Sequence, residues 1–348
     1  MTKYNAKNER IKKEFYDYLK ESKGRDDKTL DQVRSSIFRF EEYTKFKDFV
    51  TFKKEQAVGF KKHLAKQKTK RTAEAMSKST MLHISTNLKQ FFTWLRDQKG
   101  FEKIKITEID YFNLLDNDIA IAKGRKFKNY PTIEQIQKVI SGLPTSTEIE
   151  KRDRALIAFT ILTGARDAAV GTLKIKHVDL YHQSITQDPK DGVKTKFRKL
   201  IYTKFFPVGD EIAQVVIDWV KYLKEEKLYS DNDPLFPRTK LAHNKDFCFE
   251  AQGLEPTHWK TTTQIREIFK NSFEKCQLPY YNPHSFRDTL SMLGKKTCTL
   301  EQYQAWSQNL GHSKMSTSLD DYGNVSTQRQ FELIEGIKNL NQGGYFNR

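Results

Sequence analysis

The sequence has 348 residues and carries 61 Lys and Arg against 44 Asp and Glu, which gives a net charge of +17 and an isoelectric point near 9.5. This length favours two domains, and this charge favours a polyanionic partner, with nucleic acid ahead of an anionic membrane surface. The 37% hydrophobic and 12% aromatic residues exclude a disordered cationic tail, which lacks the apolar residues to build a core.

Cysteine usage and apolar run length indicate the compartment. The cysteines, Cys248, Cys276 and Cys298, are odd in number and have no Cys-x-x-Cys spacing, so neither a disulfide framework nor a zinc site is expected. No apolar run approaches the roughly 20 residues that a membrane-spanning helix needs. We therefore expect a soluble protein of a reducing cytoplasm.

The first third of the sequence predicts a helical bundle. Apolar residues recur at steps of three and four in two segments, at Leu30, Val33, Ile37 and Phe40, and at Met81, Ile84, Leu88, Phe91 and Leu95. Two more helices are predicted around residues 11–19 and 54–64. Short helices are marginal alone, so these should pack on one another within a domain over residues 1–122. Their Lys-rich outer faces are either solvated surface or contacts to phosphates.

A basic segment, "AKGRKFKNYPT", marks the predicted domain boundary at residues 123–131. It concentrates the candidate DNA contacts Lys123, Arg125, Lys126 and Lys128. Thr132 then begins a helix with Gln135 three places on, which is the pattern of a capping box. A linker of this charge is either ordinary surface or a strap that follows a DNA duplex.

The second domain, residues 132–348, is predicted to be mainly α-helical with a small antiparallel sheet. Helical periodicity starts at Ile133, and the run "ALIAFTILTGARDAAVGTL" follows. Between residues 184 and 208, turn residues separate β-branched and aromatic stretches, which predicts a hairpin of two or three strands. Helical patterns return from Asp210 onward.

Scattered along this domain is a set of residues suited to metal-free phosphoryl transfer. The set comprises Arg166, the hairpin lysines Lys194 and Lys196, His284, Arg287, His312 and Tyr322. A guanidinium offers paired donors to the oxygens of a phosphodiester in its transition state, so two arginines can take the place of metal ions. A phenol with a pKa of about 10 needs a base or a cationic surround to act as a nucleophile, and the alkoxide that leaves needs an acid such as lysine.

At these residues the chain resembles the tyrosine recombinase (phage integrase) family. The resemblance lies in "TGARD" with Arg166, "VKTKFRK" in the hairpin, "PHSFR" with His284 and Arg287, "LGH" with His312, and Tyr322 after "STSLDD". It implies a helical core-binding (SAM-like) bundle followed by an α+β catalytic domain, together clamping duplex DNA. It also implies that the two arginines hold the phosphate and that the two histidines handle protons and hydrogen bonds.

By the same resemblance Tyr322 would be the nucleophile and a hairpin lysine the general acid, with Lys196 preferred and Lys194 in reserve. The family commonly has a carboxylate three residues after the first arginine, where this chain has Ala169, and a histidine where it has Asp288. The tyrosine commonly follows the last histidine by nine residues, whereas Tyr322 follows His312 by ten, with Tyr303 as a weaker alternative.

The implied activity is site-specific DNA recombination through a 3′-phosphotyrosine, without metal, ATP or any other cofactor. The implied setting is a mobile element in the prokaryotic cytoplasm at the nucleoid. The implied partners are DNA recombination sites and a homo-oligomer, a dimer on each site and a tetramer in the synapse, with possible DNA-bending accessory proteins. An amphipathic segment at Phe331, Ile334, Ile337 and Leu340 would either cover its own domain or pass to a neighbouring protomer.

Three other hypotheses remain at this point. A metal-dependent nuclease would use Asp167, Asp179 or Asp188 as ligands, although their spacing gives no paired carboxylates. A DNA-binding architectural or regulatory protein with a decayed site would bind DNA without cutting it. A type IB topoisomerase shares the chemistry, but the length and the "LGH" pattern are more similar to integrases. The target sequence, and the choice among integration, excision, resolution and inversion, are not readable from these residues.

Overall fold

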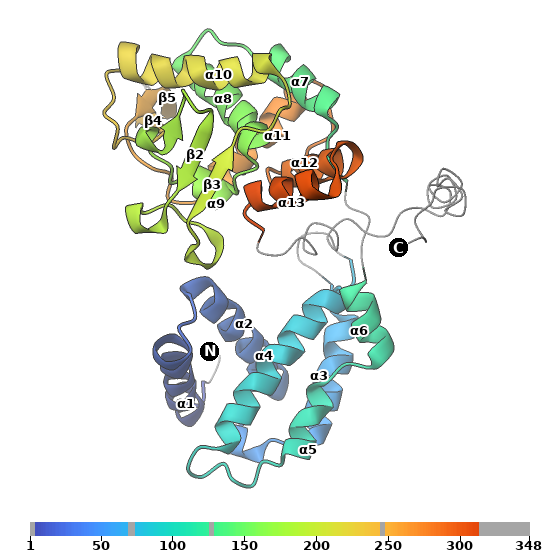
Figure 1. Ribbon diagram of the computed structural model, residues 1–348. Helices are drawn as coiled ribbons and strands as arrows, with labels where there is room; N and C mark the ends of the chain where they lie inside the picture. The colour runs from blue at the N-terminus through green and yellow to red at the C-terminus, as the bar shows by residue number, and fades with distance from the viewer. Residues whose placement is uncertain (1–3, 69–73, 125–128, 244–247, 313–348) are drawn as a thin grey trace, which may run out of the picture. The chain divides into compact units, whose positions relative to one another are not determined.

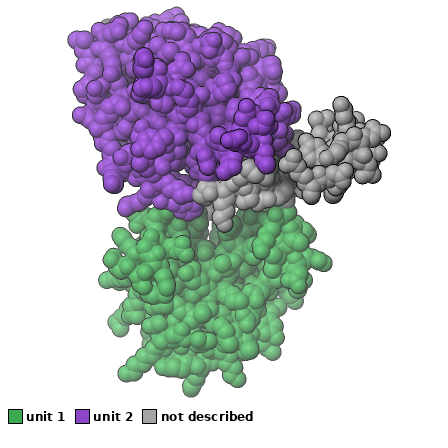
Figure 2. All heavy atoms as spheres, viewed as in Figure 1, with its two compact units in different colours: residues 1–125 green, residues 126–348 purple. Residues whose placement is uncertain are grey.

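The computed structural model describes residues 4–68, 74–124, 129–243 and 248–312. The chain divides into two compact units, residues 1–125 and 126–348 (Figure 2). Unit 1 is helical, and unit 2 combines helices with two small antiparallel sheets (Figure 1). The fold is therefore mainly α-helical with little sheet, as the sequence predicts. In the ranges described, no helix is both long and apolar enough to cross a bilayer.

Over residues 4–68 and 74–124, unit 1 shows the four predicted helices and two short ones that the sequence pattern did not reveal. Its helices are α1 (Ala6–Asp17), α2 (Asp27–Thr44), α3 (Lys54–Lys66), α4 (Lys78–Arg96), α5 (Ile106–Ile109) and α6 (Asp116–Lys123). Side chains of Asn5, Asp26 and Ser77 accept backbone N–H groups at the starts of α1, α2 and α4. Because α6 buries none of its side chains completely, it has no apolar stripe to predict it from.

An aromatic cluster fills the centre of unit 1. The rings of Phe52 and Phe92 stack with centroids 4.2 Å apart, and both contact Phe112 at 5.5 Å. Phe40 meets Phe60 and Phe92 edge to face. All five side chains are at most 2% exposed, so the stripes of α2, α3 and α4 bury each other as the periodicity requires.

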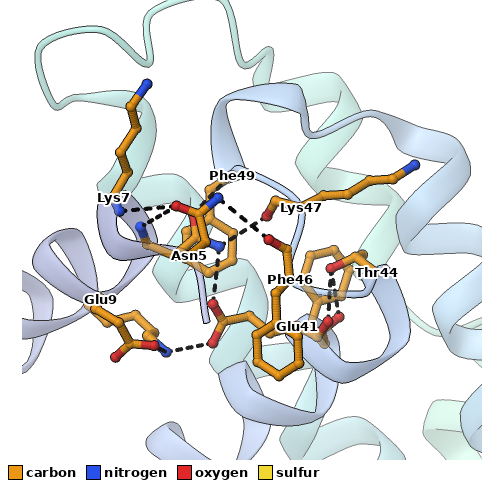
Figure 3. Close-up of polar contacts among 11 residues, drawn as sticks. Asn5, Lys7, Glu9, Glu41, Thr44, Phe46, Lys47 and Phe49 are labelled. Atoms are coloured by element: carbon orange, nitrogen blue, oxygen red, sulfur yellow. Dashed lines mark hydrogen bonds and ion pairs between the residues drawn. The ribbon is translucent and has the colours of Figure 1, made fainter. Parts of the chain in front are cut away.

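A buried polar network attaches α1 to the end of α2 (Figure 3). Lys12 Nζ lies 2.6 Å from Glu41 Oε2, and the amide of Asn8 donates to Glu41 Oε1 at 3.0 Å and to the carbonyl of Lys47 at 2.9 Å. Phe49 N–H in turn donates to Asn8 Oδ1 at 3.1 Å. The Glu41 side chain is fully buried, and burial raises its pKa although Lys12 opposes the change. Each charge therefore depends on the other to remain inside the bundle.

Unit 2 is built around one central helix. Its helices are α7 (Ile133–Gly142), α8 (Glu148–Thr163), α9 (Asp167–Val170), α10 (Asp210–Lys221), α11 (Thr263–Lys275), α12 (Ser285–Thr297) and α13 (Leu300–Asn309). The C-terminal half of α8 is buried on every side, which explains why its sequence is a continuous apolar run. The expected capping box at the start of α7 is confirmed by reciprocal hydrogen bonds between Thr132 and Gln135.

Two antiparallel sheets accompany these helices. The first has the order β1-β2-β3, from β1 (Val178–Asp179), β2 (Ser184–Gln187) and β3 (Ile201–Lys204), with Ser184 opposite Lys204. It contains the predicted hairpin. The second sheet, β4 (Arg238–His243) with β5 (Phe249–Glu255), was missed, because most of its side chains are exposed on both faces and leave no alternation to detect.

Candidate active site

Two of the predicted residues lie at the start of α12. Asn282 precedes the helix, and its side chain accepts the backbone N–H of Ser285 at 3.2 Å. His284 occupies the N-cap position of α12 and is exposed. Arg287, one turn later, is only 3% exposed. The motif thus directs one imidazole to the surface and one guanidinium into the domain.

Arg287 connects three parts of unit 2. Its Nη1 donates to the carbonyl of Gly164, and its Nη2 donates to the carbonyl of Leu310 at 2.7 Å and to His312 Nε2 at 2.8 Å. These groups belong to the turn after α8 and to the C-terminal end of α13, which are far apart in sequence. A planar guanidinium with five N–H donors suits such a junction, and lysine could not reproduce it.

The "LGH" motif is the C-terminal cap of α13. Gly311 has a φ of 72°, and the N–H of Gly311 donates to Gln308 O at 2.7 Å while that of His312 donates to Ser307 O at 3.1 Å. This pair of bonds is a Schellman motif, which explains why glycine precedes the histidine. The side chain of Asn309 adds two bonds to the backbone of Lys204 in β3, both at 2.8 Å. The position of His312 is therefore set by both a helix end and a strand.

Arg166 is presented by the turn between α8 and α9. Gly164 ends α8 with a φ of 57°, and a Cβ there would lie 2.6 Å from Leu310 Cδ2, so any other residue would be strained and would force Leu310 to move. Arg166 follows in extended conformation as the N-cap of α9. Burial lowers the pKa of its guanidinium, although arginine keeps its charge. Among the residues that the structure describes, its guanidinium makes no hydrogen bond or ion pair, which leaves its donors for a ligand.

The pKa of His312 is affected by several of the other predicted residues. Burial first, and then the electrostatic effects of Arg287, Arg166, His284 and Lys196 in that order, together lower the pKa of His312 to about 4. The imidazole is therefore neutral at pH 7. Since its Nε2 accepts from Arg287, its proton is assigned to Nδ1. The structure thus brings the predicted arginines, histidines and one hairpin lysine within electrostatic reach of a single ring.

The two hairpin lysines face different neighbours. Lys196 is exposed, begins a short 3₁₀ turn (Lys196–Arg198) and places its Nζ 4.9 Å from the ring centroid of Phe197. It is Lys196 whose charge reaches His312, whereas Lys194 acts on His258 and helps, after burial and other charges, to lower the pKa of that imidazole. This difference favours Lys196 as the lysine of the cluster.

Several expected residues cannot be placed. Tyr322, the amphipathic segment at Phe331–Leu340, and the basic residues Arg125, Lys126 and Lys128 lie outside the described residues. Lys123 is exposed at the end of α6. Tyr303 is 4% exposed within α13, as expected for a packing residue.

The carboxylates near the cluster have protein partners. Asp167 Oδ2 pairs with Nη2 of Arg266 at 2.7 Å, and Ala169 is buried where the family commonly has a carboxylate. Asp179 bonds to His182, and Asp188 accepts the N–H of Lys190. Across the described parts of the chain, no three His, Cys, Asp or Glu side chains gather closely enough to hold a metal ion. The nuclease hypothesis thus gains no ligand set from the described residues.

Sequence reasoning missed three residues whose hydrogen bonds join the segments that carry the predicted site, namely Thr172, Asp191 and Asn309. Each works through hydrogen bonds to a segment more than ten residues away, and each is a common polar residue in its local sequence. The only available signal was the proximity of Thr172 to Arg166 and of Asp191 to the hairpin lysines, which by itself specifies no partner.

Comparison with known proteins identifies the family. Residues 130–329 match the model of the phage integrase family, which is more than half of the chain. The chain belongs to the phage integrase family. Members of this family are tyrosine site-specific recombinases, and the chain is therefore an enzyme that breaks and rejoins DNA strands. A relative described as "Probable integrase/recombinase" from Aquifex aeolicus (strain VF5) is 22% identical over 328 residues, covering 90% of this chain and 95% of that protein.

Solved structures of tyrosine recombinases share the fold. A lambda integrase dimer bound to a COC′ core site has a TM-score of 0.60 at 12% identity, with 91% of this chain and 95% of that chain covered. XerH recombinase bound to a palindromic difH substrate also has a TM-score of 0.60, at 17% identity and coverages of 88% and 79%. The Tn1549 transposon integrase with a circular intermediate DNA has a TM-score of 0.58, at 14% identity and coverages of 94% and 99%.

Proposed function

We propose that this recombinase cleaves and rejoins DNA at specific recombination sites through a 3′-phosphotyrosine on Tyr322, without metal or ATP, in the service of a mobile genetic element. The observation that carries the proposal is the convergence of Arg166, Arg287, His284 and Lys196 on the neutral ring of His312. Arg166, Arg287 and Lys196 are cations, and a group of cations is costly to assemble unless an anion completes it; a DNA phosphate is the anion that the overall charge favours.

In this proposal the two guanidinium groups stabilise the phosphate as charge builds on its non-bridging oxygens. Arg166 offers donors that bond to nothing else in the described chain, and Arg287 is held rigidly by the carbonyls of Gly164 and Leu310. Preorganised donors of this kind cost no rearrangement when the reaction occurs. The neutral His312, with its proton on Nδ1, adds a further hydrogen-bond donor.

Proton transfer is divided between the remaining two groups. His284, exposed at the head of α12, takes the phenolic proton of Tyr322 as the oxygen attacks phosphorus. Lys196 gives a proton to the 5′ oxygen as the P–O5′ bond breaks. The phosphodiester energy is kept in the tyrosine–DNA bond, so a 5′ hydroxyl can reverse the reaction and reseal the strand. Lys194 is the reserve acid.

Duplex DNA with recombination sites is the proposed substrate. The lambda integrase, XerH and Tn1549 integrase structures each contain DNA, which supports a similar partner here. We also propose that the protein forms a dimer on each site and a tetramer in the synapse, with DNA-bending accessory proteins as further partners. In this proposal Lys123, Arg125, Lys126 and Lys128 contact the DNA. The amphipathic segment at residues 331–340 packs either in its own domain or on a neighbouring protomer. The setting is the prokaryotic cytoplasm, at the nucleoid.

A covalent-adduct assay tests the proposal. Purified protein is incubated with nicked attachment-site DNA in excess chelator, and adducts are separated under denaturing conditions. We expect an adduct with wild type that disappears in Tyr322→Phe and persists in Tyr303→Phe. Tight, salt-sensitive binding without any adduct would instead support an architectural protein with a decayed site. Adduct formation that chelator abolishes would support metal-dependent chemistry.

A further inference from the structure

The proposed general acid sits on a segment that its own side chains do not anchor. Every side chain from residue 196 to residue 200 is exposed, including Phe197 at 79% and Leu200 at 48%. A side chain without packing samples several rotamers, yet proton transfer needs the ammonium within hydrogen-bond reach of the leaving oxygen. The Thr195 hydroxyl closes the turn by donating to the carbonyl of Lys199 at 2.7 Å, and the contacts that attach this turn to the rest of the domain on its N-terminal side lie just before Lys196 in the chain.

The hydroxyl of Thr172 makes one such contact. It donates to the carbonyls of Ala168 and Ala169, both at 3.0 Å, and accepts the backbone N–H of Lys194 at 2.9 Å. Those carbonyls belong to α9, whose first turn is bonded to the carbonyl of Arg166 through the N–H groups of Ala169 and Val170. A single oxygen thus connects the helix that begins at Arg166 to the backbone two residues before Lys196.

The carboxylate of Asp191 makes a second contact on the same segment. It accepts from Lys174 Nζ at 2.8 Å, Lys176 Nζ at 2.7 Å and His177 Nε2 at 2.8 Å. These hydrogen bonds hold the pKa of Asp191 well below its usual range, so the carboxylate stays charged at neutral pH. His177 Nδ1 accepts the N–H of Lys174, which assigns the ring proton to Nε2 and directs it to Asp191.

The donors to Asp191 come from a rigid part of unit 2. The N–H of Ile175 donates to Asp233 O at 3.0 Å, and that of Leu235 donates to Leu173 O at 2.9 Å. Leu173, Ile175 and Leu235 are all at most 1% exposed. The hairpin segment is therefore attached to the domain core at Asp191, at the buried side chain of Val193 and again at Lys194, before β3 resumes its pairing at Ile201.

We propose that Thr172 and Asp191 are positioning residues that hold Lys196 at a set distance from Arg166, so that the acid and the phosphate clamp act on the same phosphodiester. This inference rests on the proposed function, in which Lys196 protonates the leaving 5′ oxygen. Neither residue is expected to touch DNA. Misplacing a reacting group by about 1 Å can cost on the order of a hundredfold in rate, so loss of either contact should slow cleavage.

A substrate with sulfur at the 5′ bridging position isolates this role. In the normal step a bond forms between the Tyr322 oxygen and phosphorus, the P–O5′ bond breaks, and its electron pair takes a proton from Lys196. A thiol has a pKa of about 8.5, against about 15.7 for water, so a 5′ thiolate departs as an anion and needs no acid. A defect that acts through Lys196 therefore vanishes on the sulfur substrate, whereas a general folding or binding defect remains.

The experiment measures single-turnover cleavage of both substrates by Thr172→Val, Thr172→Ser, Asp191→Asn and Lys196→Met. Valine keeps the shape of threonine but loses the hydroxyl, and serine keeps the hydroxyl. We expect Thr172→Val and Asp191→Asn to cleave the oxygen substrate about 10- to 100-fold more slowly than wild type and the sulfur substrate within about threefold of it. Thr172→Ser should cleave both substrates at rates near those of wild type. Lys196→Met should show the same pattern as Thr172→Val, with a larger loss of rate on the oxygen substrate.

Matched controls are Thr297→Val, which removes a hydroxyl that donates to the carbonyl of Leu293, and Asp179→Asn, which weakens the exposed pair with His182. Both should cleave both substrates like wild type. Equal losses on the two substrates, or no loss, in both Thr172→Val and Asp191→Asn would overturn the inference while leaving the recombinase proposal intact. No adduct from wild type on either substrate would instead refute the proposed function itself, and a Lys196→Met defect that sulfur does not relieve would remove Lys196 as the acid.

Discussion

The low pKa of His312 predicts that the catalytic unit loses stability in mild acid. In the unfolded chain the imidazole takes up a proton near its ordinary pKa of 6.5, but in the folded chain only near 4. Between these values the unfolded state binds more protons, so the stabilisation is complete above pH 6.5 and is lost as the pH falls toward 4. Protonation also removes the acceptor that Nε2 offers to Arg287.

The size of the effect follows from the same two values. Between pH 7.5 and pH 4.5 the linkage relation gives a loss of about 2.5 kcal/mol, since each unit of pKa difference is worth about 1.4 kcal/mol. His312 is only half-buried, so solvent screens part of the interaction and about 2.5 kcal/mol is the upper bound of the loss. A domain with a total stability of 5–15 kcal/mol would lose a substantial fraction of it.

Urea unfolding at several pH values measures this loss. A Trp94→Phe background confines tryptophan fluorescence to Trp219, Trp259 and Trp306 of unit 2. The reference is His312→Gln, whose amide oxygen can still accept from Arg287 but does not titrate. Subtracting its unfolding free energy at each pH cancels the other titrating groups. A difference that stays constant from pH 7.5 to 4.5, or that grows as the pH falls, would refute the reasoning.

Two further predictions concern stability. Gly164→Ala should destabilise unit 2 by about 2–4 kcal/mol in urea unfolding, because it adds the cost of a left-handed alanine to a clash with Leu310. The control is Gly192→Ala, where φ is 90° but nothing lies within 4 Å, and it should cost only about 1–2 kcal/mol. Equal losses in the two variants would contradict the clash. Lys12→Met should destabilise unit 1 by about 3–5 kcal/mol, followed through Trp94, because it leaves Glu41 buried and unpaired. The double variant with Glu41→Leu should regain most of that loss, and a double variant as unstable as the single one would show that packing, not charge, is responsible.

How far the sequence predicts the fold depends on whether a segment buries one face. The stripes of α2 and α4 and the buried run of α8 were legible because their apolar spacing matches their burial. The strands β4 and β5 could not be predicted, because both of their faces are exposed and their sequences show no alternation of apolar and polar residues. Local periodicity reports burial, so elements that bury little are hidden from it.

The site residues differ in the same way: those in short local motifs could be predicted, and those that depend on distant partners could not. Arg166, Arg287 and His312 were found because each stands in a short motif with a structural cause, such as the glycine turn before Arg166 and the helix cap before His312. Thr172 and Asp191 act through hydrogen bonds to partners that only the folded chain brings near. The position of Tyr322 relative to these groups stays a prediction.

The two hydrogen bonds between Asn309 and Lys204 also affect whether β3 can pair with a strand of another molecule. β3 lies at the rim of its sheet, where an unpaired peptide group invites a strand from another molecule. The carboxamide of Asn309 has the same donor and acceptor as a peptide, and it occupies both groups of Lys204. The side chain thereby imitates one residue of a missing neighbour strand and blocks growth of the sheet at that end, so the residue that fixes the position of His312 also protects this edge against aggregation.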